Sequence, residues 1–272
     1  MNTKLHRFAA FVAFATFILI IAGGLVTSTG SGLSVPDWPL SFGKLMPPME
    51  GGVFYEHGHR MIATTIGLLT ILLAFGLWKF ERPGIRVLGF LALGMVLLQG
   101  VLGGLTVLLK LPPQVSVAHA LIGPIFFSLI VTIAVLTGIS DLSPQPRESQ
   151  PLGKLRRLGL LTSGFILFQM FLGAVLRHTG WGLHAHLTGA FLVLVHVILL
   201  ARRTIQQESE DAAFLRSSIL MIVIVALQIT LGLLAWRLPT VVITTAHQGT
   251  GSALLAAAVV LTVLSYIRRQ PT

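Results

Sequence analysis

Eight long apolar runs alternate with short polar segments along the chain. They cover approximately residues 8–27, 61–78, 87–109, 116–139, 158–176, 187–201, 217–236 and 241–267. Most approach the roughly 20 residues that an α-helix needs to cross the hydrocarbon core of a bilayer. The second and sixth runs are shorter, and their helices gain length if they begin at the preceding histidines. Because backbone groups in lipid must be hydrogen-bonded within their own segment, the pattern predicts an all-α integral membrane protein with eight transmembrane helices.

The composition supports a membrane environment. Hydrophobic residues make up 54% of the 272 residues and charged residues only 10%, which would expose too much apolar surface in water. The chain has no cysteine, and this excludes a disulfide framework, an iron–sulfur cluster held by this chain and a thiolate metal site. Histidine is the strong metal ligand that remains.

The basic residues predict the orientation of the spans. In an eight-span arrangement, 14 of the 19 lysines and arginines fall on one side: Lys4, Arg7, Lys79, Arg82, Arg86, Arg147, Lys154, Arg156, Arg157, Arg202, Arg203, Arg216, Arg268 and Arg269. The positive-inside rule places that side and both termini in the cytoplasm of a multi-pass protein of the cell (inner) membrane. This distribution explains the net charge of +10, and nucleic acid is excluded as a partner because no basic cluster has interleaved aromatics. We expect the first run to be kept as a span, although its basic flank resembles a signal peptide.

The two halves of the chain resemble each other. Residues 23–32 (GGLVTSTGSG) recur as residues 173–182 (GAVLRHTGWG) at an offset of 150. Three further matches are His57-Gly58-His59 with His184-Ala185-His186 at an offset of 127, Ala118-His119 with Ala246-His247 at 128, and Leu98-Gln99 with Leu227-Gln228 at 129. Several matches in one order predict an internal repeat of four spans.

This repeat predicts the domain organisation. Residues 1–140 form an N-terminal four-helix half, residues 141–154 a cytoplasmic linker, and residues 155–272 a C-terminal four-helix half. The halves differ chiefly in the first outer loop, which carries about 23 additional residues around positions 34–48. Parallel repeats preserve orientation, so equivalent residues lie at equivalent depth on the same side.

Four histidines occupy equivalent places in the repeat. His59, His119, His186 and His247 each stand at the outer start of an inward-running helix, two in each half. Two neutral imidazoles that face each other in a four-helix bundle can take both axial positions of a haem iron. The residue four positions later on the same helix face is small in every case: Ala63, Gly123, Ala190 and Gly251. A flat macrocycle that lies against the helix needs small side chains one turn after its ligand. The pattern therefore predicts haem.

The remaining histidines have separate interpretations. His57 and His184 would point about 200° away from the neighbouring ligand on a continuous helix, which indicates a supporting or surface role. The open alternative is that either replaces its neighbour as the ligand if the helix begins at another residue. His178 follows Arg177 at the outer edge, where both suit a carboxylate such as a haem propionate; a solvated loop pair is the open alternative. His196 lies inside the sixth span and is interpreted as a hydrogen-bonded core residue. His6 is a flanking residue.

The halves are not equivalent in their acids. Glu56 lies three residues before His59, and no acid occupies the corresponding place before His186. It is either an acid favoured by the helix dipole or a catalytic group that accepts a proton or stabilises a cation. Arg60 beside it is a candidate ion partner of Glu56 or a propionate contact.

These residues resemble a known family. GGLVTSTGSGLSVPDWPL from Gly23, EHGHR from Glu56, LQGVLGGLTV from Leu98, LRHTG from Leu176, and the helices carrying His119, His186 and His247 together resemble the haem A synthases, which act in cytochrome oxidase assembly. The resemblance covers essentially the whole chain. It implies an eight-helix duplicated bundle that oxidises the C8 methyl of haem O to a formyl group.

The resemblance also implies roles for the two halves. His59 and His119, with Glu56, are assigned to the substrate haem O, and His186 and His247 to a haem b cofactor. Haem O synthase, cytochrome oxidase assembly and an electron-transfer partner are the implied partners besides membrane lipid, and a homo-oligomer is left open. Many family members carry outer-loop cysteine pairs, but here Ser41 follows DWPL where one such cysteine would stand.

Several alternatives stay open at this point. If both His59 and His119 ligate iron, either one of them dissociates to admit oxygen, or the iron only passes electrons while water is added to the oxidised methyl. A protein of another class, a bis-histidine haem b electron carrier, would show two similar haems and no altered macrocycle. A transporter is disfavoured because no span has an acid or a paired unwound segment at its midplane.

Overall fold

The computed structural model describes residues 3–138, 153–208 and 211–267, and within these ranges the chain forms eight α-helices. They are α1 (Thr3–Ser28), α2 (Gly52–Phe80), α3 (Pro83–Leu108), α4 (Pro113–Gly138), α5 (Gly153–Thr179), α6 (Leu183–Glu208), α7 (Ala212–Arg237) and α8 (Val241–Ile267). Each is long and apolar enough to cross a membrane, which confirms the predicted multi-pass protein. Most of the predicted linker, residues 141–154, lies outside the described residues, as do Arg147, Arg268 and Arg269.

The two short apolar runs belong to longer helices. Helix α2 begins at Gly52, before His57 and His59, and α6 begins at Leu183, immediately before His184. Many hydroxyl groups inside the spans bond to their own helix; for example, Thr70 Oγ1 donates to the Ile66 carbonyl at 2.7 Å. Such bonds within one helix avoid the penalty of an unpaired polar group in lipid.

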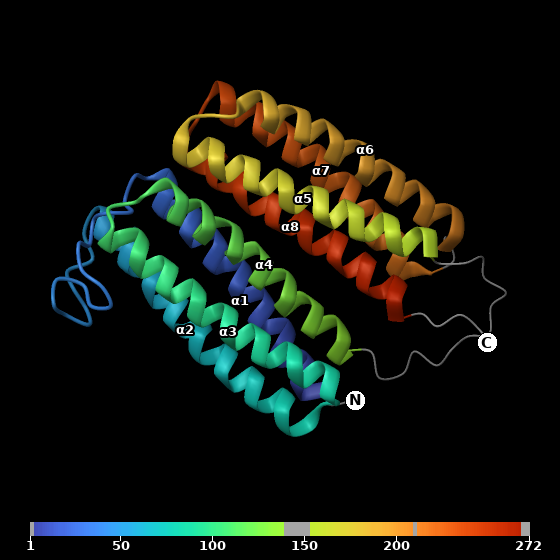
Figure 1. Ribbon diagram of the computed structural model, residues 1–272, viewed down its shortest axis with the longest axis horizontal. Helices are drawn as coiled ribbons and strands as arrows, with labels where there is room; N and C mark the ends of the chain where they lie inside the picture. The colour runs from blue at the N-terminus through green and yellow to red at the C-terminus, as the bar shows by residue number, and fades with distance from the viewer. Residues whose placement is uncertain (1–2, 139–152, 209–210, 268–272) are drawn as a thin grey trace.

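The helices form two four-helix groups, as Figure 1 shows. In the first, each of α1 to α4 packs against two others of the group, and α5 to α8 repeat the same order of neighbours. Each group has its own apolar core, centred on residues such as Ile66 and Ile130 in the first and Leu200 and Met221 in the second. The groups meet through α1 and α4 on one side and α5 and α8 on the other.

All even-numbered helices begin at one end of the molecule, which we call the histidine end (Figure 1). At this end Ser28 joins the two groups, because its hydroxyl accepts hydrogen bonds from Thr244 Oγ1 at 2.9 Å and Thr245 Oγ1 at 3.1 Å. The loop of residues 29–51, called the outer loop below, extends from the same end on the side away from α5 to α8. That this end is the outer one stays a prediction from the basic residues.

Candidate haem sites at the histidine end

The four predicted ligands lie in the first two turns or so of their helices, all at the histidine end. His59 and His119 come from α2 and α4, and His186 and His247 from α6 and α8. All four side chains are partly buried. The structure therefore brings the predicted histidines together as one pair in each half.

Each histidine ring of the first half packs against a glycine of the preceding helix. A Cβ built on Gly23 of α1 would lie 3.1 Å from Cε1 of His59. A Cβ built on Gly103 of α3 would lie 3.2 Å from Cε1 of His119. Both distances are shorter than ordinary contacts of a Cβ, so only glycine lets these rings lie so close to the neighbouring backbone.

The second half repeats this arrangement. Gly173 of α5 faces His186, with a built Cβ 3.1 Å from Cε1, and Gly232 of α7 faces His247 at 3.0 Å. Four glycines on the odd-numbered helices thus form cradles for four imidazoles on the even-numbered helices. A ring held flat against a helix backbone has few other orientations available, which fixes the direction of its nitrogens.

The second pair has the spacing of two axial ligands. The rings of His186 and His247 have centroids 6.3 Å apart and planes inclined by 79°. A metal–imidazole bond of about 2.0 Å and a ring centre roughly 1 Å behind the nitrogen place two axial imidazoles roughly 6 Å apart. The observed separation therefore leaves room for one metal ion between the rings.

The other polar features also fit haem. The Nδ1 atoms of His59, His119 and His247 are buried and make no hydrogen bond within the described residues, an arrangement that costs about 1–3 kcal/mol per group unless the ring serves a ligand. Over the same residues no group of three or more His, Cys, Asp or Glu side chains is placed to hold a bare metal ion. A haem needs only two protein ligands, because its macrocycle supplies the others.

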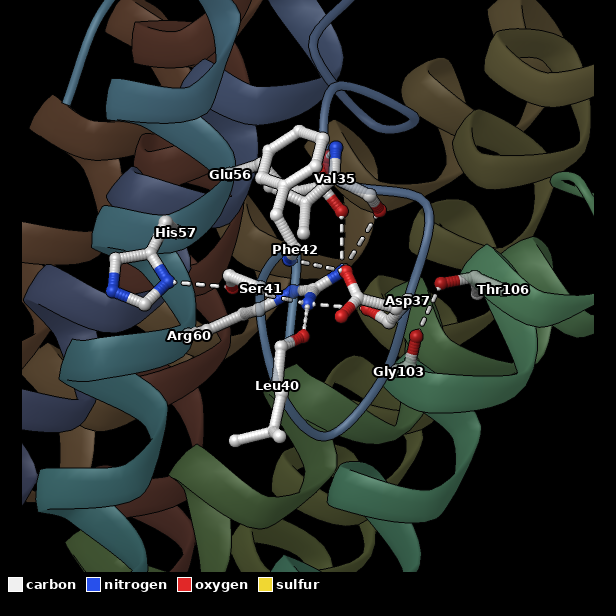
Figure 2. Close-up of polar contacts among 10 residues, drawn as sticks. All are labelled: Val35, Asp37, Leu40, Ser41, Phe42, Glu56, His57, Arg60, Gly103 and Thr106. Atoms are coloured by element: carbon white, nitrogen blue, oxygen red, sulfur yellow. Dashed lines mark hydrogen bonds and ion pairs between the residues drawn. The ribbon is translucent and has the colours of Figure 1, made fainter. Parts of the chain in front are cut away.

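The predicted acid of the first half lies in an ion pair (Figure 2). Glu56 is only 3% exposed; its Oε1 accepts a hydrogen bond from Arg60 Nη2 at 2.7 Å, and its Oε2 accepts one from the backbone N–H of Val35 at 2.8 Å. Of the two predicted roles for Arg60, the structure shows the ion partner. The carboxylate is thus a tether between α2 and the outer loop, beside the first histidine pair.

Arg60 and His57 hold the outer loop in place. Nη1 of Arg60 donates to the carbonyls of Asp37 at 2.7 Å and Leu40 at 3.0 Å. Nδ1 of His57 lies 2.8 Å from the hydroxyl of Ser41. His57 therefore has the predicted supporting role, and both terminal nitrogens of Arg60 are engaged.

The outer loop also crosses to α3. The indole of Trp38 lies against Gly104, where a built Cβ would come within 2.6 Å of Cδ2. Gly104 follows Gly103, the cradle of His119, so the loop packs one residue away from the first pair. Asp37 braces the loop itself by accepting hydrogen bonds from the backbone N–H groups of Phe42 at 2.7 Å and Gly43 at 2.8 Å.

Arg177 and His178 lie at the boundary between the halves. Nη2 of Arg177 donates to the hydroxyl of Ser28 on α1 at 3.2 Å. His178 is partly buried and within electrostatic range of His119. Although both residues end α5, they thus face the first half, where two basic groups suit an anionic carboxylate.

The other histidines have ordinary structural contacts. His196 Nδ1 lies 2.9 Å from the carbonyl of Leu192, and its ring is 4.1 Å from that of Phe165, as predicted for a core residue. His184 is exposed. His6, predicted as a flank, joins α1 to α4 through a 2.9 Å contact between Nδ1 and the carbonyl of Ala134.

Sequence reasoning missed three glutamines. Gln99, Gln169 and Gln228 each precede a cradle glycine by four residues, and their side chains lie beside the turns of His119, His186 and His247. The small residues Gly123 and Gly251 face the amides of Gln99 and Gln228, and their proximity to a macrocycle stays a prediction. The repeated Gln-x-x-x-Gly spacing was the available signal.

Comparison with known proteins shows the family of the chain. Residues 6–185 match the model of a family described as cytochrome oxidase assembly protein. The chain belongs to this family. The matched range includes Glu56, His59 and His119 and ends just before His186.

Several relatives that share one name match a similar length of the chain. The chain is 36% identical over 189 residues to a protein of Exiguobacterium sibiricum, 30% over 187 residues to one of another Exiguobacterium, and 32% over 188 residues to one of Bacillus pumilus. Each of these proteins is named "Heme A synthase". Each match covers 66% of this chain and 60% or 61% of the relative, so the chain spans about three fifths of the length of these relatives.

Proposed function

We propose that this chain is a haem A synthase that oxidises the C8 methyl of haem O to a formyl group. The proposal rests chiefly on two histidine pairs at one end of a membrane bundle, of which only the first has a buried carboxylate beside it. Membership of the cytochrome oxidase assembly family and the names of the relatives support it. Haem O synthase as the source of substrate and an electron-transfer partner are implied partners.

The two halves have different tasks in this proposal. His59 and His119, in the half of residues 1–140, bind the iron of the substrate haem O, and His186 and His247, in the half of residues 155–272, bind a haem b cofactor. The 6.3 Å separation of the second pair supports its part. Bound haem iron supplies one-electron redox chemistry.

Polar residues around the first pair orient the substrate and handle its protons. Arg177 and His178 are proposed to bind a propionate, because both face the first half and one is already hydrogen-bonded to α1. Arg60 is proposed to contribute less to propionate binding than Arg177 and His178, because its terminal nitrogens already donate hydrogen bonds to the outer loop and to Glu56.

Glu56 is the proposed catalytic group. Oxidation of a methyl to a formyl group releases electrons and protons and adds one oxygen atom, so a carboxylate near the substrate can accept a proton or stabilise positive charge. Each carboxylate oxygen has a further lone pair beyond the hydrogen bonds from Arg60 and Val35. A Glu56→Gln variant that made haem A at the normal rate would remove Glu56 from the reaction.

The function is tested by expressing the chain in cells that make haem O and analysing the extracted haems by chromatography and mass. The proposal predicts hydroxylated and formylated haem, both absent from cells that express a His59→Ala, His119→Ala double variant. Two bound but chemically unaltered haems would indicate the electron carrier instead.

A further inference from the structure

Two of the four candidate ligands receive a direct hydrogen bond from a glutamine of the neighbouring helix. Nε2 of Gln99 on α3 donates to the carbonyl of His119 at 3.0 Å. Nε2 of Gln169 on α5 donates to the carbonyl of His186 at 2.8 Å and lies 3.0 Å from its ring Nδ1. These bonds tie the helical turn that carries the histidine to the helix that cradles its ring.

A third glutamine acts on the turn of His247 through a threonine. Oε1 of Gln228 on α7 accepts a hydrogen bond from Thr250 Oγ1. The same hydroxyl lies 3.2 Å from the carbonyl of His247. Because this hydroxyl has a single proton, the bond to Gln228 holds Thr250, three residues after His247, and not the His247 carbonyl itself. Gln228 thus ties the third histidine turn to α7 at Thr250.

Glycines on the histidine helices make room for these glutamines. Gly123, Gly189 and Gly251 each face the glutamine side chain of the neighbouring helix. A Cβ built on Gly123 would lie 3.2 Å from the amide nitrogen, and one built on Gly251 would lie 3.1 Å from it. Glutamine and glycine thus form a matched pair, because a larger residue would displace the amide from its hydrogen bond.

His59 has neither member of this pair. Four residues before its cradle glycine, Gly23, stands Leu19, whose side chain cannot donate a hydrogen bond. The matched glycine lies three or four residues after the other histidines, whereas Ile62 and Ala63 stand at these places after His59. The polar residues that flank His59 are instead bound to the outer loop, as Arg60 is through the carbonyls of Asp37 and Leu40.

We propose that Gln99, Gln169 and Gln228 are positioning residues that lock three histidines onto iron, and that His59, which lacks such a lock, is the axial position where a small external ligand exchanges. This inference rests on the proposed function, since it needs haem between the histidines. Its physical basis is that the turns of His119 and His186 are hydrogen-bonded directly to a neighbouring transmembrane helix and lose that bond when the ligand moves away. The turn of His59 is instead bound through Glu56 and Arg60 to the outer loop, and a loop can move together with the turn. Oxygen and similar diatomic molecules would therefore reach the first-half iron on the His59 side.

Carbon monoxide binding to the reduced, haem-loaded protein in detergent tests this inference. We expect CO to bind faster at the haem of the first half than at that of the second. The double substitution Leu19→Gln, Ala63→Gly transfers the matched pair to His59 and is expected to slow CO binding about fivefold, the effect of one hydrogen bond, with unchanged haem content. The reverse change, Gln169→Leu in the second half, removes one hydrogen bond and is expected to speed CO binding at the second haem about fivefold.

The outcomes separate the inference from the function on which it rests. Haem content and the low-spin electron paramagnetic resonance signal report whether histidine pairs hold haem at all, and protein without haem would overturn both. Full haem content with equal CO binding at both haems, or with CO binding unchanged in the two variants, would overturn the inference alone. If the double variant does not fold, Gln169→Leu decides, because loss of CO selectivity supports the inference and its persistence overturns it.

Discussion

Nη2 of Arg60 lies 2.7 Å from Oε1 of Glu56, one helical turn apart on α2, and the two side chains together bind the outer loop (Figure 2). The buried carboxylate therefore depends on Arg60 for its charge partner, and the loop depends on both. Mutation of a carboxylate that only holds a loop changes the stability of the loop, whereas mutation of one that takes part in the reaction changes the activity. Substitutions at this pair therefore distinguish the two roles of Glu56.

Replacing Arg60 with methionine should release the outer loop. The change leaves Glu56 buried without its partner and removes the bonds to the loop carbonyls, a loss of about 3 kcal/mol for a buried pair. Because proteolysis follows the population of the open loop, trypsin cleavage after Lys44 should become roughly a hundredfold faster. Glu50→Gln, at an exposed side chain of the same loop, is the control. Equal cleavage of the Arg60 variant and the wild type would show that the ion pair does not hold the loop.

The Asp37 brace should make the loop resistant to moderate acid. The N–H groups of Gly43 and Phe42 hold the pKa of the Asp37 carboxyl below its ordinary value. A lowered pKa in the folded loop means that the stabilisation is present above the ordinary aspartate pKa of about 3.9 and is lost only as the pH falls through the lowered value. Protection of the loop amides from hydrogen exchange, corrected for the intrinsic rate, should thus be constant from neutral pH to about pH 4. Loss of protection at about pH 6, or full protection in Asp37→Asn, would contradict this account.

The cradle glycines should be intolerant of even one added methyl group. In Gly173→Ala the new Cβ would lie 3.1 Å from Cε1 of His186, so the ring must shift from its position on α5. Overpacking of this kind costs about 1–3 kcal/mol, and the haem affinity of the second half should fall roughly tenfold or more. Gly164→Ala is the matched control on the same helix, since a Cβ there meets nothing within 4 Å. Haem titration of both variants measures the difference, and indistinguishable affinities would exclude the cradle.

The fold was largely readable from the sequence because the bilayer imposes one simple rule. Eight apolar runs gave eight spans, and the short sixth run extended to Leu183 as its histidines suggested. The histidine pairs could also be predicted, since equal offsets place His59 and His186, or His119 and His247, at equivalent points. The orientation and the internal repeat remain sequence predictions.

The contacts of the site were less accessible from sequence. The outer loop has no periodicity, so nothing in the sequence placed the carbonyls of Asp37 and Leu40 around the Arg60 guanidinium. The positions of small residues were recognised, but their neighbours depend on side chains of another helix, as Gln99 beside Gly123 shows. Hydropathy fixes which segments span the membrane, whereas helix rotation and side-chain packing decide what each face meets.

The central claim is that histidine pairs at the histidine end hold haem, and haem-to-protein ratios of the purified chain test it most directly. His247→Ala should lose the second-half haem and its low-spin spectrum, because one imidazole cannot supply both axial ligands. His184→Ala, an exposed histidine two residues from His186, should retain the wild-type ratio and spectrum. A His247→Ala protein with the full wild-type haem content and spectrum would contradict the account.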